Sequence, residues 1–318
     1  MNTVVLSYIP VDKKFITYYE RAGFEIHFAL TPPERDSLTP ELLDSVRAVL
    51  TIGTIGITRE QIDALPNLEI ICAQGVGYER IDIAAARARN IHVTHGPNTN
   101  SSAVADHTVA LMLAVTREIV YFDHRTRQGE WAKARNVPAG MFGKRLGIIG
   151  MGNIGRLIAK RCAGGFEMPI GYFNRREIAD SPYHYFDSPQ ALAQWADYLV
   201  VATPGGKDTL KLVDAEVLHA LGPAGYLINI ARGTVVDTQA LIESLQNNTL
   251  AGAALDVLDG EPDVPDQMMG IRNNLVLTPH VAGRSPEAMH NMVQLVVDNL
   301  SAYFRGEAVK TPVPDSHS

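Results

Sequence analysis

The sequence predicts an α/β protein of two domains, each built on a parallel sheet with helices on both faces. Short β-branched runs alternate with helix-like segments from residue 3 to residue 96, and a second alternating series begins at "RLGIIGMGNIG", residues 145–155. Such alternation is typical of βαβ units and parallel sheets. A chain of 318 residues is long enough for two domains of ordinary size.

The first series is expected to form one sheet. Its apolar runs predict strands at residues 3–9, 25–30, 48–53, 68–75 and 91–96. The segments between these runs predict helices, most clearly at residues 11–23, 58–66 and 81–90. These elements make up the first part of a domain that the end of the chain is expected to complete.

Two long helices are expected to connect the domains. Residues 100–122 and residues 285–305 each carry an apolar face, the latter through Met289, Met292, Val293, Val296 and Leu300. Residues 121–143 are polar and irregular and predict an arm. The second sheet is expected to use the runs at residues 145–155, 169–174, 197–203, 225–231, 250–257 and 274–280. The predicted domains are therefore residues 1–99 with 286–318, and residues 100–285.

Composition favours a cytoplasmic enzyme. The formal net charge is −7 with acids and bases mixed along the chain, which disfavours a nucleic-acid partner. The start of the chain reads as a strand and not as a signal peptide, and no apolar run approaches the ~20 residues of a membrane span. The two cysteines, Cys72 and Cys162, lie in apolar surroundings and predict buried thiols in a reducing compartment. No metal site is expected.

A glycine-rich turn predicts a dinucleotide site. Gly150, Gly152 and Gly155 form the pattern G-x-G-x-x-G between an apolar strand and an amphipathic helix. In that setting the glycines permit a tight turn, close approach of a pyrophosphate and close packing of helix on strand. A turn used for packing alone is the other interpretation. The expected cofactor contacts in the turn are Gly150, Met151, Gly152, Asn153, Ile154 and Gly155.

The next strand lacks the acid that such a site commonly uses to bind the adenosine ribose. About 20 residues after the turn the sequence reads Asn174, Arg175, Arg176. A carboxylate would repel a 2′-phosphate, whereas two arginines can bind one through charge-assisted hydrogen bonds. This indicates NADP(H) as the preferred cofactor. If the arginines are only solvated surface residues, the cofactor is NAD(H).

Three charged residues follow predicted strands in the second half of the chain. Arg232, Glu261 and His280 are expected at the carboxyl edge of the sheet, where ligands bind in open α/β folds. Reduction of a 2-oxo acid needs a proton donor, which a histidine provides, and a carboxylate beside the imidazole orients it. An arginine can bind the substrate carboxylate and polarise the carbonyl. Each residue taken singly also has a structural interpretation, and only the combination favours catalysis.

Six segments together resemble the D-isomer-specific 2-hydroxyacid dehydrogenase family over nearly the whole chain. They are "GVGYERIDI", "NSSAVADHTVALMLA", "LGIIGMGNIG", "INIARGTVVD", "LAGAALDVLDGEP" and "NLVLTPHVAG". The resemblance implies a Rossmann cofactor domain, residues 100–285, beside a flavodoxin-like substrate domain. It also implies a homodimer.

The resemblance further implies roles for individual residues. Arg232 would bind the substrate, Glu261 would pair with the histidine, and His280 would be the proton donor. Asp256 would contact the nicotinamide amide. The substrate loop would use backbone N–H groups around Gly75, Val76 and Gly77, with Arg232 and His280 completing the substrate site. Further cofactor contacts are expected at Thr203, Pro204, Thr209, Ile230 and Ala231.

Within this family "FNRR" is similar to members that use NADPH to reduce glyoxylate and hydroxypyruvate. We therefore expect reduction of a small 2-oxo acid to the D-2-hydroxy acid. One alternative is an NAD-dependent dehydrogenase with another substrate preference. The other is a dinucleotide-sensing binding protein of the same fold, which should carry docking extensions or long polar tails. The chain departs from the common family pattern at Glu79-Arg80 and at residues 205–208, "GGKD", which leaves the fine substrate preference open.

Overall fold

The computed structural model describes residues 2–314, which fall into two compact units. Unit 1 comprises Met1–Asn100 and Ser285–Ser318, and unit 2 comprises Ser101–Arg284. The chain therefore leaves unit 1 after residue 100 and returns to it at residue 285. Residues 1 and 315–318, which the predicted first domain includes, lie outside the described residues.

Unit 1 contains a five-stranded parallel sheet in the order β2-β1-β3-β4-β5. This is the flavodoxin-like strand order, which confirms the predicted fold of this part of the chain. Its strands are β1 (Thr3–Ser7), β2 (Phe24–Phe28), β3 (Val46–Thr51), β4 (Ile70–Ala73) and β5 (His92–Thr94). Its helices are α1 (Lys13–Arg21), α2 (Pro32–Asp36), α3 (Pro40–Ser45), α4 (Arg59–Asp63), α5 (Ile83–Ala88) and α13 (Pro286–Phe304).

The helices of unit 1 cover both faces of its sheet. On one face, Phe15 and Tyr19 of α1 pack with Val293 and Leu300 of α13. On the other face, α4 and α5 pack against the same strands. The short helices α2 and α3 are absent from the sequence-based prediction. Each begins with a threonine cap followed by proline, a local start signal that the apolar periodicity does not contain.

Unit 2 contains a seven-stranded parallel sheet in the order β12-β11-β10-β9-β6-β7-β8. Read from its first strand, this is the Rossmann order with one strand added, so the predicted fold is confirmed here too. Its strands are β6 (Leu146–Ile149), β7 (Ile170–Phe173), β8 (His184–Phe186), β9 (Tyr198–Val201), β10 (Tyr226–Asn229), β11 (Gly252–Leu255) and β12 (Leu275–Leu277). The strand order reverses between β6 and β9, and ligands of such sheets bind at this switch point.

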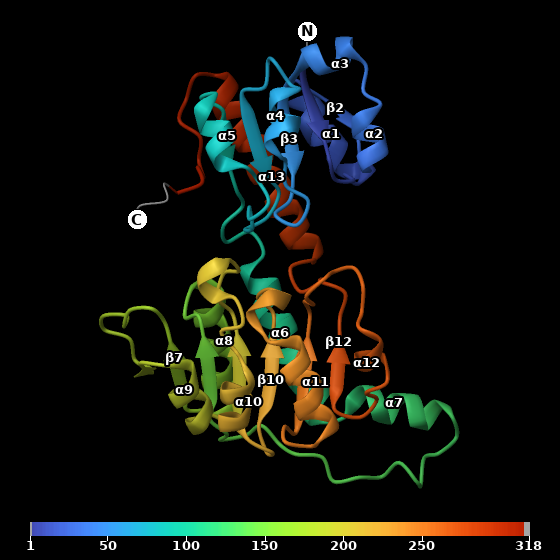
Figure 1. Ribbon diagram of the computed structural model, residues 1–318, viewed down its shortest axis with the longest axis vertical. Helices are drawn as coiled ribbons and strands as arrows, with labels where there is room; N and C mark the ends of the chain where they lie inside the picture. Colours follow the sequence, from blue (N-terminus) through green and yellow to red (C-terminus); the bar gives the residue numbers. More distant parts are fainter. Residues whose placement is uncertain (1, 315–318) are drawn as a thin grey trace. The chain divides into compact units, whose positions relative to one another are not determined.

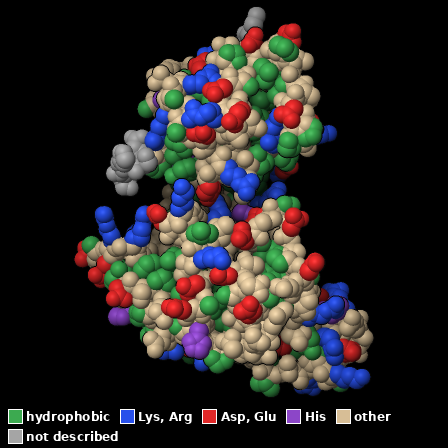
Figure 2. Space-filling model, in the orientation of Figure 1, with side chains coloured by type: hydrophobic (Ala, Val, Ile, Leu, Met, Phe, Trp, Pro, Cys, Tyr) green, Lys and Arg blue, Asp and Glu red, His purple; other side chains and the backbone are tan. Residues whose placement is uncertain are grey.

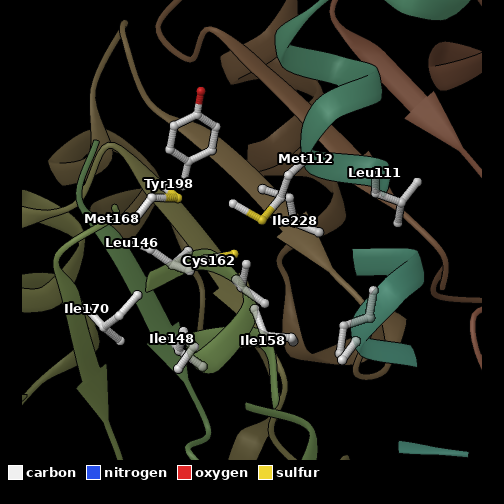
Figure 3. Close-up of a cluster of buried hydrophobic side chains, with 14 of the residues drawn as sticks. Leu111, Met112, Leu146, Ile148, Ile158, Cys162, Met168, Ile170, Tyr198 and Ile228 are labelled. Carbon is white, nitrogen blue, oxygen red and sulfur yellow. The ribbon is translucent and has the colours of Figure 1, made fainter. Parts of the chain in front are cut away.

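Two layers of helices enclose the sheet of unit 2 (Figure 1). The helices are α6 (Ser101–Thr116), α7 (Ile119–Arg127), α8 (Asn153–Phe166), α9 (Pro189–Trp195), α10 (Ala215–Leu221), α11 (Thr238–Gln246) and α12 (Asp266–Met269), with short 3₁₀ turns η1 (Lys207–Thr209) and η2 (Gly233–Val235). Figure 3 shows the core under α6 and α8, to which Ile148 of β6, Met112 of α6, and Ile158 and Cys162 of α8 contribute. Helices α9, α10 and α11 cover the opposite face.

The prediction of one helix over residues 100–122 is wrong. Helix α6 ends at Thr116, Glu118 takes a left-handed conformation with φ of 51°, and α7 begins at Ile119. The predicted arm, residues 121–143, is therefore helical in its first part. The apolar pattern misled the prediction because Ile119 and Val120 continue it although both are exposed, at 52% and 57%. Strand β8 is likewise absent from the prediction.

Surface and thiol properties agree with the composition. On the face that Figure 2 shows, acidic and basic side chains are interspersed. Cys72 and Cys162 are both free and buried, as predicted. Within residues 2–314 no helix has the length and apolarity needed to cross a membrane. The same residues contain no cluster of three or more His, Cys, Asp or Glu suited to holding a metal.

Candidate active site

The glycine-rich turn lies at the switch point of the unit 2 sheet. Gly150 follows β6 with φ of +100°, and a Cβ on it would lie 2.7 Å from the backbone N of Thr203, which follows β9. A Cβ on Gly155 would lie 2.3 Å from the carbonyl oxygen of Gly150. These two glycines are therefore required by close backbone packing.

Gly152 differs from its two neighbours because a Cβ there would meet no atom within 4 Å. Open space therefore lies in front of the turn, where helix α8 begins at Asn153 and presents its first N–H groups. Met151 is buried and Ile154 packs on the core, so these two side chains anchor the turn to the protein interior on the side away from the open space. The arrangement fits a pyrophosphate bound at the start of α8.

The residue at the usual position of the ribose-binding acid braces the turn. Oδ1 of Asn174, just beyond β7, accepts a hydrogen bond from the Met151 N–H at 2.7 Å. Arg175 and Arg176 follow and are exposed. No carboxylate stands at position 174, and the two guanidinium groups make this end of the site positive. These residues fit a cofactor with a 2′-phosphate.

The loop after β9 connects the two ends of the site. Thr209 Oγ1 donates to the carbonyl oxygen of Pro204 at 2.9 Å, which closes the loop on itself. A Cβ on Gly205 would lie 2.6 Å from Cγ of Arg232, so the loop packs directly on this arginine. At the other end of the loop, Oδ2 of Asp208 lies 3.8 Å from Nη1 of Arg175.

Arg232 is placed by a turn that follows β10. Buried Asn229 accepts from the Ala231 N–H at 3.0 Å and donates to the carbonyl oxygen of Arg232 at 3.0 Å. Ile230 and Ala231 are buried, and the Arg232 side chain is half-buried. A Cβ on Gly233 would lie 1.9 Å from the carbonyl carbon of Leu258, which brings this turn against the segment that carries Glu261.

His280 and Glu261 form a hydrogen-bonded pair beyond β12 and β11. Nδ1 of His280 lies 2.8 Å from Oε2 of Glu261, and Oε1 of Glu261 accepts from the Leu258 N–H at 2.9 Å. Because a carboxylate only accepts, the contact assigns the proton to Nδ1 and leaves Nε2 to face a ligand. The side chains are 37% and 31% exposed, so solvent and ligands reach the pair. His280 has φ of 53°, a strained conformation for a residue other than glycine and one often found at functional sites.

Asp256 lies at the end of β11 and holds the histidine segment. Its carboxylate is buried and accepts from the N–H groups of Val281 and Ala282, each at 2.9 Å, and from Thr278 Oγ1 at 2.5 Å. Its carbonyl oxygen accepts from the His280 N–H at 2.8 Å. A contact between Asp256 and the nicotinamide amide stays a prediction.

Several supporting residues were missed from the sequence. They are Asn229, Thr278, Asp208 and His107, whose Nε2 lies 3.0 Å from Thr278 Oγ1. The available signal was a polar residue at the end of an apolar strand for Asn229 and directly after one for Thr278. Asp208 and His107 meet partners far along the chain, which no local pattern reveals.

The predicted substrate loop belongs to unit 1 and follows β4. Gly75 has φ of +130°, and a Cβ on Gly53 would lie 2.6 Å from the carbonyl carbon of Gly77. Nδ1 of His95 donates to the carbonyl oxygen of Val76 at 3.0 Å. The loop is therefore tightly folded, and its conformation requires glycine at position 75.

Comparison with known proteins bears directly on this arrangement. The family model described as D-isomer specific 2-hydroxyacid dehydrogenase, NAD binding domain, matches residues 109–282. A 2-ketogluconate reductase of Gluconobacter oxydans is 42% identical over 291 residues, which cover 91% of this chain and 93% of the relative. A glyoxylate/hydroxypyruvate reductase of Arabidopsis thaliana is 41% identical and covers 89% of this chain and 90% of its own length.

A solved structure extends the similarity to the whole fold. The NADPH-dependent glyoxylate/hydroxypyruvate reductase of Sinorhizobium meliloti, in complex with NADP and malonate, matches with a TM-score of 0.90. The sequences are 34% identical, and the match covers 98% of this chain and 97% of the other.

Proposed function

Because the chain belongs to the D-isomer-specific 2-hydroxyacid dehydrogenase family, we propose that it reduces a small 2-oxo acid to the D-2-hydroxy acid with NADPH. The observation that carries the proposal is the 2.8 Å contact between His280 and Glu261. It lies on the same sheet edge as Arg232 and the glycine-rich turn. That edge therefore combines a proton donor, an anion-binding group and a dinucleotide site.

His280 is the proposed proton donor. Its Nε2 gives a proton to the oxo oxygen of the substrate, while Glu261 holds Nδ1 and stabilises the protonated ring. Arg232 binds the substrate carboxylate and polarises the carbonyl. When bound, the reduced nicotinamide supplies the hydride that the carbonyl carbon accepts. Backbone N–H groups at Gly75, Val76 and Gly77 are proposed to bind the same carboxylate.

The cofactor preference rests on the end of β7. The family binds NAD(P), and the structural relative from Sinorhizobium meliloti is an NADP complex. In this chain Asn174 removes the repulsive carboxylate, and Arg175 and Arg176 supply positive charge for a 2′-phosphate. We assign the pyrophosphate to Gly150–Gly155 and the remaining cofactor contacts to Thr203, Pro204, Thr209, Ile230, Ala231 and Asp256. A homodimer is also proposed, by similarity to the family.

Substrate choice is the open part of the proposal, because relatives of similar identity have different names. A kinetic panel of glyoxylate, hydroxypyruvate, pyruvate and 2-ketogluconate, each with NADPH and NADH, tests it. We expect turnover with NADPH to be highest for glyoxylate or hydroxypyruvate. If none of these acids, nor any bulkier oxo acid, oxidises NADPH, the reductase function is wrong. A dinucleotide-sensing protein would bind the cofactor and still give that result.

A further inference from the structure

Arg175, one of the two proposed 2′-phosphate ligands, is paired with a carboxylate of this chain. Nη1 of Arg175 lies 3.8 Å from Oδ2 of Asp208. The two residues come from different parts of unit 2: Arg175 follows β7, and Asp208 lies in η1 after β9. The side chains are 87% and 82% exposed, so water and ligands have access to both.

An exposed ion pair of this kind is weak and exchanges readily with other partners. A 2′-phosphate carries more negative charge than one carboxylate and offers several acceptor oxygens, so it competes for the same guanidinium. The carboxylate of Asp208 then stands beside an anion of like charge, which opposes binding. A cofactor without the 2′-phosphate neither competes for Arg175 nor is repelled by Asp208.

The position of Asp208 is fixed by the fold of its loop. Thr209 Oγ1 donates to the carbonyl oxygens of Pro204 at 2.9 Å and Gly206 at 3.3 Å, and Gly205 packs on Cγ of Arg232. The backbone that carries Asp208 is therefore held in a closed loop, and from it the carboxylate reaches Arg175 beyond the end of β7. The neighbouring Lys207 adds a positive charge to the same loop, so removal of the Asp208 charge leaves Lys207, Arg175 and Arg176 as cations here.

We propose that Asp208 is a cofactor-specificity residue that weakens the preference for NADP(H) by competing with the 2′-phosphate for Arg175. This inference rests on the proposed function, since it concerns the same dinucleotide site. Asp208 makes the site more tolerant of NAD(H) than the two arginines alone would make it.

The test compares the full-length protein with Asp208→Asn by calorimetric titration with 2′,5′-ADP and with 5′-AMP. We expect Asp208→Asn to bind 2′,5′-ADP roughly three- to tenfold more tightly and 5′-AMP unchanged. The gain should disappear in the double variant with Arg175→Ala, because the guanidinium for which Asp208 and the 2′-phosphate compete is then absent. Asp123→Asn is the matched control, since Asp123 pairs with exposed Arg127 on α7 in the same unit.

Three results would overturn the inference: unchanged affinity for 2′,5′-ADP, an equal gain for both nucleotides, or a gain that persists in the Arg175→Ala background. The titration requires no turnover. A protein that reduces no oxo acid but shows the selective gain would disprove the reductase function and leave the role of Asp208 intact. A protein that reduces oxo acids but shows no gain in affinity for 2′,5′-ADP would support the reductase function and disprove the role of Asp208.

Discussion

Nδ1 of His280 lies 2.8 Å from Oε2 of Glu261, and the second carboxylate oxygen of Glu261 accepts from the Leu258 N–H. One carboxylate therefore orients the imidazole and fixes its own loop at the same time. Such a partner sets which ring nitrogen faces a substrate.

Glu261→Gln should lower kcat for oxo-acid reduction roughly tenfold to hundredfold. His280 and Leu258 each contact a different carboxylate oxygen of Glu261, and a glutamine replaces one of these acceptors by an NH₂ group. Steady-state kinetics checks this, with Glu216→Gln on α10 as the control for loss of a surface charge. The KM for NADPH should stay near the wild-type value. If Glu261→Gln has the wild-type kcat, Glu261 does not contribute to the reaction.

Arg175→Ala should lower kcat/KM for NADPH at least about tenfold and leave kcat/KM for NADH nearly unchanged. Loss of one charge-assisted hydrogen bond costs roughly 1.5–3 kcal/mol of binding free energy. Only NADPH has the 2′-phosphate with which Arg175 would form such a bond. The ratio of kcat/KM for the two cofactors is the measurement, and Arg176→Ala gives the parallel comparison. If both variants change the two cofactors equally, the arginines do not bind the 2′-phosphate.

Gly205→Ala should reduce kcat/KM for the oxo acid about tenfold or more, with little change in cofactor affinity. The added methyl would lie 2.6 Å from Cγ of Arg232 and must displace the side chain that we propose binds the substrate carboxylate. Gly165→Ala adds the same methyl on α8, where no atom lies within 4 Å, and serves as the control. Unchanged kinetics in Gly205→Ala would mean that the position of Arg232 does not limit the reaction.

Native protein should react slowly with Ellman's reagent at about pH 8, and unfolded protein should react at both thiols. Burial raises the pKa of Cys72 and of Cys162 to about 12, so little thiolate exists in the folded state. The time course of absorbance after mixing, with and without denaturant, checks this. Rapid labelling of the native protein would show that at least one thiol is accessible.

Much of the fold was readable because parallel strands are buried on both sides and appear as short apolar runs. The runs around Leu146 and Leu199 are examples, and both are fully buried strands in the structure. The break after Thr116 was not readable, because Ile119 and Val120 continue the apolar pattern on exposed positions. Helix α2 was missed because it is short and buries no side chain.

Site residues were predictable where they belong to a local sequence motif with a known chemical role. They were not predictable where the fold brings together segments that are distant in the sequence. Gly150–Gly155 and the strand-end positions of Arg232 and His280 follow from local sequence. The pairing of Arg175 with Asp208 spans 33 positions of the numbering, and it depends on β7 and β9 lying on either side of β6. The clamp that Asp256 makes on residues 281–282 is equally non-local.

The central claim is that His280 donates the proton. Replacement of His280 by glutamine, followed by assay of NADPH oxidation with glyoxylate and hydroxypyruvate, tests it most directly. We predict that kcat falls roughly 10²- to 10⁴-fold while NADPH binding, followed by its fluorescence, stays near wild type. Turnover of either acid at the wild-type rate by His280→Gln would contradict the account.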